Sequence, residues 1–528
     1  MDKQMAQHYD GKVKDWFSIF IVVILAFFPF ALLVSFFLKS PGVFKVIKTP
    51  YVISVVKFTF FQAILSAVLS IFIGLPGAYL LSRTRIPLRS LFRSLSMVPF
   101  VVPGIVMALG MVGILGRKGI LSLILSIFGF KPRSFLYSFW SIILAHVIYN
   151  FPVTIRVVGD AWERIDEDTV NSAMLEGYGR FGAFLRIDLP LLFPSILFSF
   201  LLSFSYCFTS FSVVMIIGGV RFSTMEVLIY SNLRSFLNLD VALSLTIFQS
   251  MILGMVSLIT FKLGGFILEE PTKVSRGEKI PRWTLFYSIP MIVFGFSPII
   301  SSILLGFVEH GGMGLSNFMA FFSHDSPALE NLTKALGFTL FYSTSASLFT
   351  LFISFMAGYS GKLIHRFLAN MLVGISPVTL AYGYSILGKM MNMDINSMHI
   401  LLIPIYTVIT YPIALTIMTS TWRYFPKQLL EMAEVDGADK FQKFFHVILP
   451  NMKEEMISSF LLCSAVSMGE LAATLTLQSP DFLTISTLIY RMYSSRHFQE
   501  AKVLNTILSA MIIAMFILGE YISKSDEE

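Results

Sequence analysis

Two polar stretches of this chain, 260 residues apart, have Ala, an acidic residue, Gly and Pro at the same spacing. The first reads NSAMLEGYGRFGAFLRIDLP (171–190) and the second EMAEVDGADKFQKFFHVILP (431–450). In each, an Ala stands four residues before a Gly, and a Pro follows that Gly by thirteen. Neither stretch offers a nucleophile constellation or a metal-ligand cluster. The repeated chemistry therefore favours docking and the transfer of force over catalysis.

Each stretch predicts a short helix, a bend and a second short helix. The polar segments 166–176 and 428–436 have helical character and end at a Gly, which tolerates positive φ and ends a helix. An amphipathic segment follows, and the Pro begins the next apolar run, where its missing N–H costs little. We expect the small residues Ala173 and Ala433 to let another protein approach closely. An ordinary amphipathic connection is the alternative, but two copies at an equal offset favour a function.

The elements around these stretches are membrane helices. The chain of 528 residues is 55% hydrophobic and 13% charged, with a mean hydropathy of +0.76. Apolar runs of eighteen or more residues recur and must be helices, because a lipid-exposed backbone has to bond to itself. A β-barrel would instead show short alternating segments. The net charge of +7 lies mostly at the ends of these runs, so it indicates membrane topology and no nucleic-acid partner.

Twelve spans are expected, in two halves of six. The polar stretch Glu269–Arg282 is the clear linker between the halves. The N-terminal run is too long for the apolar region of a signal peptide, so we expect a retained first helix. The spans are 17–38, 53–81, 91–115, 138–158, 192–218, 241–268, 284–308, 332–360, 367–388, 398–421, 455–478 and 501–523.

The basic residues of the short loops favour both termini inside. The loop after the second span holds Arg83, Arg85, Arg89 and Arg93, and the linker holds four more basic residues, whereas 309–330 has no Lys or Arg. The outer loop 116–137 is an exception, because it carries four basic residues (Arg117, Lys118, Lys131 and Arg133).

The two halves are repeats of each other. At an offset of 260, Pro152 matches Pro412 and Trp162 matches Trp422, and nearer the start of each half the offset is 280. The difference lies in the third-to-fourth span connection, which is longer in the first half. Because each half has an even number of spans, the repeats are parallel and a pathway is expected between them.

Polar residues inside the spans are the remaining candidates. Glu470 lies in an apolar run, where a carboxylate must face a cavity or a partner; it is either a pathway residue or a packing carboxyl. Its repeat partner is Ser210. His146 and Asn150 are interpreted as interhelical hydrogen-bonding groups. Glu226 is expected in an outer or re-entrant loop, where it faces water or contacts a cationic partner or another protein, and water is favoured. Cys207 and Cys463 are interpreted as small core residues.

The repeated loop resembles the EAA loop of the permease subunits of binding-protein-dependent ABC importers with the type I fold. In that family the loop forms a coupling helix that docks in a groove of the ATPase. The first copy departs from the motif, because Asn171 and Ser172 stand where the family has Glu and Ala; the second has Met432 at the middle position. Two permease units in one chain resemble the iron(III)/thiamine subfamily, through FTFFQAILSAVLS (58–70), LAHVIYNFP (144–152) and CFTSFSVVMIIGG (207–219).

The resemblance implies an all-α permease of about 12 transmembrane helices in the inner membrane, multi-pass, with both termini cytoplasmic. It also implies an ATPase dimer inside, an extracytoplasmic solute-binding protein outside, and ferric iron or thiamine as cargo. The chain has no GxxxxGK[ST] loop, so it is expected to be no enzyme and to hold no cofactor, with ATP bound by the partner. A twelve-helix secondary transporter is the alternative, but it needs no duplicated docking loop and would place charges in several spans.

The expected domains follow the repeats: 1–50 with the first helix, 51–268 as the first permease domain, 269–283 as the linker, 284–331 with the seventh helix, and 332–524 as the second permease domain. The ATPase-coupling residues carried over or lying in the loops are Ala173, Glu176, Gly177, Pro190, Glu431, Ala433, Asp436, Gly437 and Pro450. The pathway candidates are Glu470, Ser210 and His146.

Overall fold

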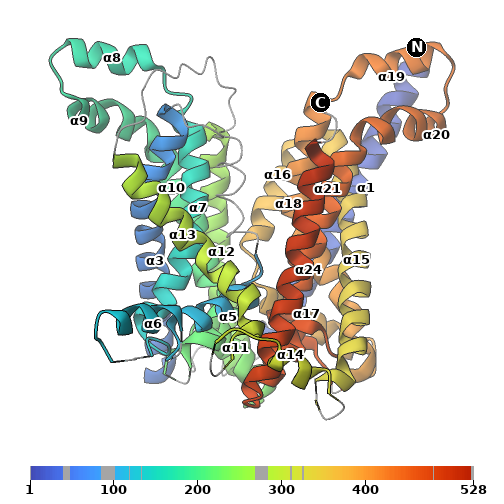
Figure 1. Ribbon diagram of the computed structural model, residues 1–528. Helices are drawn as coiled ribbons and strands as arrows, with labels where there is room; N and C mark the ends of the chain where they lie inside the picture. The colour runs from blue at the N-terminus through green and yellow to red at the C-terminus, as the bar shows by residue number, and fades with distance from the viewer. Residues whose placement is uncertain are drawn as a thin grey trace. The chain divides into compact units, whose positions relative to one another are not determined.

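The computed structural model describes residues 2–39, 48–84, 102–267 and 283–524, apart from short gaps at 118, 132–133, 220, 310–311, 324–325, 327 and 480. Over these residues the regular elements are helices, which confirms the all-α class (Figure 1). The linker 269–282 and the loop residues Arg85, Arg89 and Arg93 lie outside the described residues, as do Lys118 and Arg133 and the first part of the expected third span.

Within the described residues, ten helices are long and apolar enough to cross a membrane. The count is up to eleven if the pair Leu363–Val373 and Pro377–Met390, bent by 96°, forms one span. The remaining expected span, 455–478, falls on two helices that a break separates, α21 (Leu449–Met468) and α22 (Ala472–Leu477). The chain is therefore a polytopic helical membrane protein.

The chain divides into two compact units that differ from the two halves expected from the linker. The first unit is Ser40–Gly314, and the second unit combines Met1–Lys39 with Leu315–Glu528. Each unit holds one repeat together with the first helix of the other half. The apolar pattern of a first helix shows that the helix spans the membrane, but the pattern does not show which repeat the helix packs against.

The first unit is built around α3 (Pro50–Arg83) and α7 (Phe139–Trp162), which pack along their lengths. A Cβ atom at Gly74 would lie 2.6 Å from the Cβ atom of Thr154, so a small residue is needed for this close approach. The other described helices of the unit are α5 (Gly104–Leu115), α6 (Ile120–Ile127), α10 (Leu189–Phe208), α11 (Met225–Arg234), α12 (Leu239–Ile267) and α13 (Trp283–Leu304).

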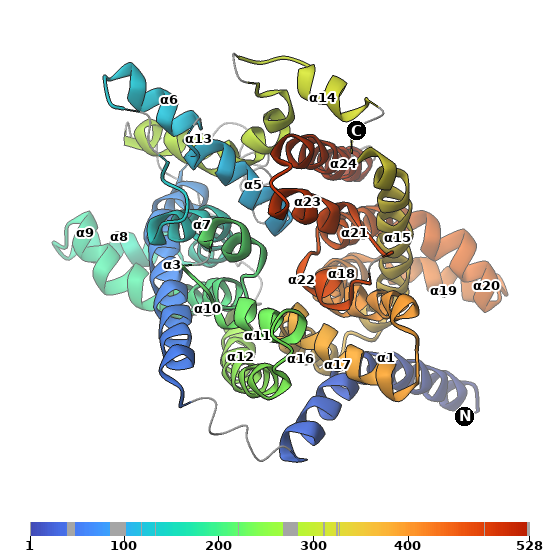
Figure 2. The same ribbon diagram turned by 90° about the horizontal axis from the view of Figure 1, so that it is seen from below.

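Helix α13 packs on α5 of the first repeat, although it follows the linker in sequence (Figure 2). The Tyr287 hydroxyl donates a hydrogen bond of 2.6 Å to the carbonyl oxygen of Ile73 in α3. A Cβ atom at Gly110 of α5 would lie 2.0 Å from the carbonyl oxygen of Pro298, so Gly is required there. These contacts fix α13 in the first unit.

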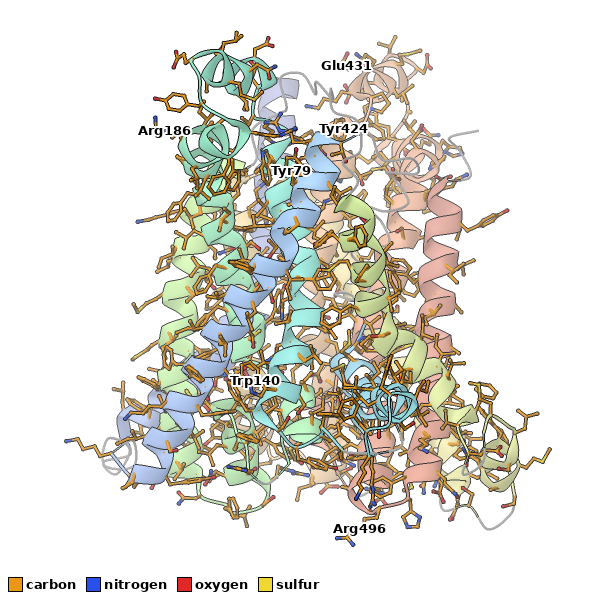
Figure 3. All side chains as sticks on the ribbon, turned by 60° about the vertical axis from the view of Figure 1, so that its left-hand side comes forward. Tyr79, Trp140, Arg186, Tyr424, Glu431 and Arg496 are labelled. Carbon is orange, nitrogen blue, oxygen red and sulfur yellow. The ribbon has the colours of Figure 1, made fainter. Side chains whose placement is uncertain are left out.

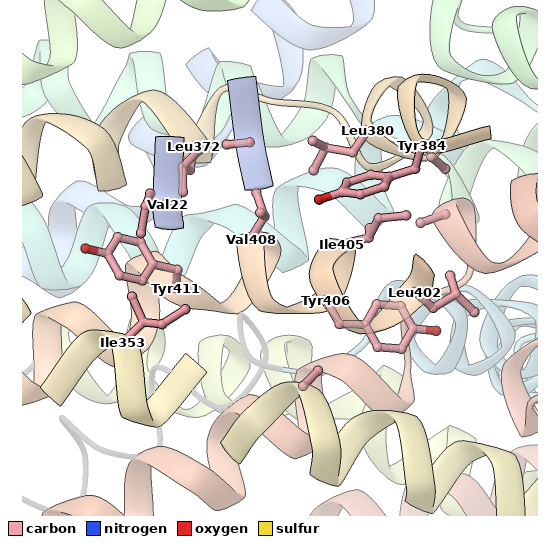
Figure 4. Close-up of a cluster of buried hydrophobic side chains, with 14 of the residues drawn as sticks. Val22, Ile353, Leu372, Leu380, Tyr384, Leu402, Ile405, Tyr406, Val408 and Tyr411 are labelled. Atoms are coloured by element: carbon pink, nitrogen blue, oxygen red, sulfur yellow. The ribbon is translucent and has the colours of Figure 1, made fainter. Parts of the chain in front are cut away.

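Helix α1 (Asp2–Lys39) makes the reciprocal exchange and packs in the second unit. The Tyr384 hydroxyl donates a hydrogen bond of 2.8 Å to the carbonyl oxygen of Leu25. Val22 belongs to the large buried cluster of this unit, with Tyr411 and Leu402 (Figure 4). The other described helices are α14 (Ser316–Phe321), α15 (Leu329–Ser360), α16 (Leu363–Val373), α17 (Pro377–Met390), α18 (Leu402–Tyr424), α21, α22, α23 (Ile485–Ser494) and α24 (Phe498–Lys524).

The repeats are also visible in single hydrogen bonds. The backbone N–H of Met225 donates to the Thr59 hydroxyl at 2.9 Å, and that of Ile485 donates to the Thr339 hydroxyl at 2.9 Å. Thr59 and Thr339 are 280 residues apart, and Met225 and Ile485 are 260 apart, which are the two offsets of the sequence repeat. The same joint between two helices is therefore built in both units.

Candidate functional site

Two loops of paired short helices lie at one end of their own units (Figure 1). Loop 1 (residues 163–188) contains α8 (Glu167–Leu175), α9 (Arg180–Ala183) and the π-helical turn η1 (Phe184–Asp188). Loop 2 (residues 423–448) contains α19 (Lys427–Val435), α20 (Lys440–Lys443) and the π-helical turn η5 (Phe444–Ile448). The predicted order of helix, bend and helix is confirmed in both.

The bend is the same Schellman motif in both loops. Gly177 has φ +94° and Gly437 has φ +77°, the left-handed conformation that favours glycine. In loop 1 the N–H of Gly177 donates to the carbonyl of Met174 at 3.1 Å, and the N–H of Tyr178 donates to the carbonyl of Ala173 at 3.2 Å. Loop 2 repeats both bonds, with Gly437 and Ala438 as donors at 3.1 and 2.9 Å. The spacing from Ala to Gly therefore encodes a helix C-terminus.

The side chain of the repeated Ala is covered by its own loop. Ala173 is buried and Ala433 is half-buried. Since α8 packs against α9 and η1, a small residue at this position lets the two arms of the loop close on each other. In this chain Ala173 therefore shapes the loop from inside, and the close approach of another protein at this position stays a prediction.

Large apolar side chains are exposed at matching positions of the two loops. Leu175 and Val435, at the last helical residue before the bend, are 89% and 88% exposed. Phe181 and Phe441, in the second short helices, are 73% and 78% exposed. A third pair, Leu185 and Phe445, is also exposed. The three residues of each loop are called its apolar trio. Single exposed apolar residues are common, but three at matching positions of both loops indicate a surface that binds a partner.

The charged residues of the loops are largely exposed. Figure 3 shows Glu431 on the projecting part of loop 2, where it is exposed, and its counterpart Asn171 is exposed in loop 1. Glu176 and Asp436 follow the last helical residue in each loop and are exposed. Glu434 and Lys443 form an ion pair at 2.7 Å across loop 2. Around the apolar trio the surface is therefore polar.

Loop 1 is attached to its unit through a buried charged group. The Trp162 indole N–H donates to the Asp188 Oδ1 atom at 3.0 Å, and the Arg83 guanidinium lies 3.6 Å from the same oxygen. The Arg83 and Asp188 side chains are only 8% and 10% exposed. This cluster joins the end of α3, the end of α7 and the end of loop 1.

Loop 2 is attached through apolar contacts instead. Ile448 stands at the repeat position of Asp188 and packs on a buried apolar cluster, whereas Leu363, which is 280 residues after Arg83, begins α16 and is 66% exposed. The Trp422 indole N–H donates to the carbonyl oxygen of Phe355 at 3.2 Å, and the ring packs against Phe425 and Met452. After each loop, Pro190 and Pro450 are the second residues of α10 and α21, as predicted from the missing N–H.

Two of the three pathway candidates meet in the first unit. The His146 Nε2 atom and the Ser210 hydroxyl are 2.8 Å apart. Ser210 lies just after the end of α10 at Phe208, before the π-helical turn η2 (Val214–Gly218). Asn150 donates to the His146 carbonyl at 2.9 Å and to the Cys207 sulfur at 3.3 Å, which confirms its role as an interhelical hydrogen-bonding group.

Glu470 caps a helix in the second unit. Its carboxylate accepts hydrogen bonds from the backbone N–H groups of Ala472, Ala473 and Thr474, at 2.9, 3.0 and 3.2 Å, at the first turn of α22. The Thr474 hydroxyl also lies 2.5 Å from the hydroxyl of Tyr406, which stands at the repeat position of His146. These bonds match the packing interpretation of this carboxyl, and both units place a polar pair at the break of the helix.

Glu226 does not face water, and that interpretation is wrong. The side chain is fully buried in the first turn of α11, and its carboxylate accepts a hydrogen bond from the Gln249 amide of α12. The sequence around Glu226 could not reveal this partner, because it comes from the following helix. Cys207 and Cys463 are free and buried, as predicted.

The family model of binding-protein-dependent transport system inner membrane components matches this chain twice, at residues 68–268 and 283–523. The chain belongs to this family. The permease is 25% identical to the thiamine transport system permease protein of Brucella melitensis over 496 residues, which cover 90% of this chain and 89% of the relative. It is 24% identical to that of Escherichia coli (89% of both chains). It is 24% identical to a putative ferric transport system permease protein of Haemophilus influenzae (90% of this chain and 79% of the relative).

Membership fixes the general role of the chain. It is the membrane permease of an ABC importer, multi-pass in the inner membrane, with ATPase and binding-protein partners. It is no enzyme, and ATP is bound by the separate ATPase subunit.

Sequence reasoning missed Asp188 and the ion pair between Arg156 and Asp160 at 2.9 Å. Aligning the repeats could have found both, because apolar or uncharged residues stand at the matching positions Ile448, Thr416 and Ser420.

Proposed function

We propose that loop 1 and loop 2 are the two docking sites of the ATPase, one for each of its two subunits. The observation that carries this proposal is the apolar trio, which both loops expose in the same order around the same glycine bend. A Phe side chain that stays in water forgoes about 2 kcal/mol of burial free energy, so two exposed copies at equal positions favour an apolar groove on a partner.

The two contacts are unequal. Loop 2 has the exposed acid Glu431, where loop 1 has Asn171. A carboxylate can make a charge-assisted hydrogen bond, which is about twice as strong as a neutral one. Because the two ATPase grooves are alike in a dimer of identical subunits, the contact at loop 2 is the stronger one.

The orientation follows from this assignment. If the loops face the ATPase, both are cytoplasmic, and the parallel repeats leave both termini on the same side, in agreement with the basic residues around Arg83. The opposite ends of the helices then receive an extracytoplasmic binding protein. We place the pathway beside the two helix breaks, near the pair of His146 and Ser210 in one unit and near Glu470 in the other.

The cargo is thiamine or ferric iron. The support is the resemblance to permeases of both kinds, because a thiamine permease and a putative ferric permease each match 90% of this chain. In such an importer the binding protein does most of the selection of the cargo, so the binding protein should be tested together with the permease.

Reconstitution tests the proposal. The permease is placed in liposomes with its ATPase and binding protein, and uptake of thiamine and of ferric iron is measured with ATP inside. Uptake is expected only with ATP and all three proteins. Replacing Phe181 and Phe441 by Ser should abolish uptake, whereas the same change at Phe349, an exposed residue of α15 outside both loops, should leave uptake intact. Uptake driven by an ion gradient alone would instead support a secondary transporter.

A further inference from the structure

A polar face lies near the loop end of α7 and of its repeat α18, and neither loop includes it. In α7 the Arg156 guanidinium pairs with the Asp160 carboxylate at 2.9 Å, inside a candidate membrane span, and both side chains are partly exposed. Charged side chains within a span avoid hydrocarbon and face water or protein. In α18 the repeat positions hold Thr416 and Ser420, both exposed. The same face is therefore polar in each unit, with different chemistry.

In the second unit this face borders a groove of about 440 Å³ between α18 and the start of α21. This volume falls in the range of small-molecule sites and far exceeds a bare metal ion. The polar residues lining the groove are Thr416, Ser420, Thr421, Tyr424, Asn451 and Glu455. Phe425 and Pro426 close it at the base of loop 2, so an occupant would contact the segment that leads into α19.

The charge of the groove is of one sign. Glu455 is the one charged residue among those lining it, and no Lys, Arg or His lines it. Among the described residues, the half-buried Glu455 carboxylate has no hydrogen-bond or ion-pair partner. In the first unit, Leu191 and the buried Ser195 stand at the positions of Asn451 and Glu455, so the groove chemistry is specific to the second repeat. A cleft with one sign of charge concentrates ions of the opposite sign.

We propose that this groove is a binding site for a small organic cation at the loop end of the second unit. Glu455 balances the charge, the hydroxyl groups of Thr416, Ser420 and Thr421 offer hydrogen bonds, and the Tyr424 ring offers a face for a flat cation. A ferric ion would need several anionic ligands, and no cluster of three or more His, Cys, Asp or Glu residues occurs in the described part of the chain. The identity of the cation as the imported cargo rests on the proposed function, but the site itself does not.

Charge-selective labelling tests the groove directly. Ser420→Cys is introduced into the full-length permease in complex with its ATPase, where the native Cys207 and Cys463 are buried. Modification rates are measured with a trimethylammonium-bearing and a sulfonate-bearing methanethiosulfonate, each normalised to a free thiol. The cationic reagent should react faster, and Glu455→Gln should reduce this preference by at least about fivefold. Glu454→Gln, which removes the same charge from the next residue, is the matched control and should not reduce it.

Millimolar thiamine, a flat organic cation, should slow labelling in the Glu455 protein and not in the Glu455→Gln variant. An unchanged preference in Glu455→Gln, or no protection by thiamine, would overturn the proposal. Thr416→Cys is a second reporter on the same groove if Ser420→Cys assembles poorly. If ATP-driven uptake is normal but labelling shows no preference for the cationic reagent, the cation site is refuted and the proposed function stands. If labelling prefers the cationic reagent but no uptake occurs, the proposed function is refuted and the cation site stands.

Discussion

Asp188→Asn should detach loop 1 from its unit while leaving loop 2 in place. The carboxylate accepts from Trp162 at 3.0 Å and lies 3.6 Å from the Arg83 guanidinium, in a site where both charged side chains are about nine-tenths buried. Removing one partner of a buried ion pair leaves an uncompensated charge, which costs about 3–5 kcal/mol. At about 3 kcal/mol, the population of detached loop 1 would rise about a hundredfold.

A double variant supplies the control for this experiment. Arg83→Leu combined with Asp188→Ile removes both buried charges at once, and Ile is the residue that the second repeat has at the position of Asp188, as Ile448. Replacing a buried ion pair by apolar residues of similar volume is often neutral or stabilising, so the double variant should recover much of what Asp188→Asn loses.

Two readouts separate the outcomes. Limited proteolysis of the complex reports loop 1 directly, and ATP hydrolysis stimulated by the binding protein reports coupling. Asp188→Asn should speed cleavage within 163–188 and lower the stimulated hydrolysis, with cleavage of 423–448 unchanged. A silent Asp188→Asn, or a double variant that is as impaired as the single one, would refute the view that the ion pair anchors the loop.

Three further changes probe the bends, the unequal loops and the capping carboxyl. Gly177→Ala and Gly437→Ala should each destabilise the bend of its loop by about 1–2 kcal/mol, because φ is positive at both sites, and Asn should be tolerated better than Ala. Stimulated ATP hydrolysis should therefore fall more with Ala than with Asn, and equal effects of the two residues would contradict this reasoning. Gly437→Pro should abolish coupled hydrolysis at least as fully as Gly177→Pro, since loop 2 makes the stronger contact; a clearly larger loss at Gly177 would count against this ranking. Glu470→Ala should destabilise the purified permease by about 1–2 kcal/mol in thermal unfolding, because three backbone N–H groups of α22 lose their acceptor, whereas Glu470→Gln keeps one acceptor oxygen and should lose less. A drop in transport with Glu470→Gln at full stability would instead make this carboxylate a pathway residue.

The sequence predicted what depends on local pattern. The apolar runs predicted the membrane helices, and the spacing of Ala173, Gly177 and Pro190 predicted a helix end, a bend and a helix start. The equal offsets predicted the repeat. The helices and the bends are determined by residues that are close together in the sequence, and the repeat is found by comparing two stretches of the sequence without knowing what either one contacts.

What the sequence could not predict depends on partners distant in the chain. The pairing of α1 with the second repeat, the amide of Gln249 beside Glu226 and the guanidinium of Arg83 beside Asp188 all require the packing of separate helices. The burial of Ala173 could not be predicted either, because a single small residue carries no periodicity that shows which face of a helix is buried.

The number of ATPase subunits bound to the permease tests the central claim most directly. Native mass spectrometry would be applied to the wild-type complex and to a variant with Ser at all six positions of the two apolar trios. The wild type should carry two ATPase subunits. The variant should carry none while its helical circular dichroism is unchanged. Two ATPase subunits still bound to the folded variant would contradict docking through these loops.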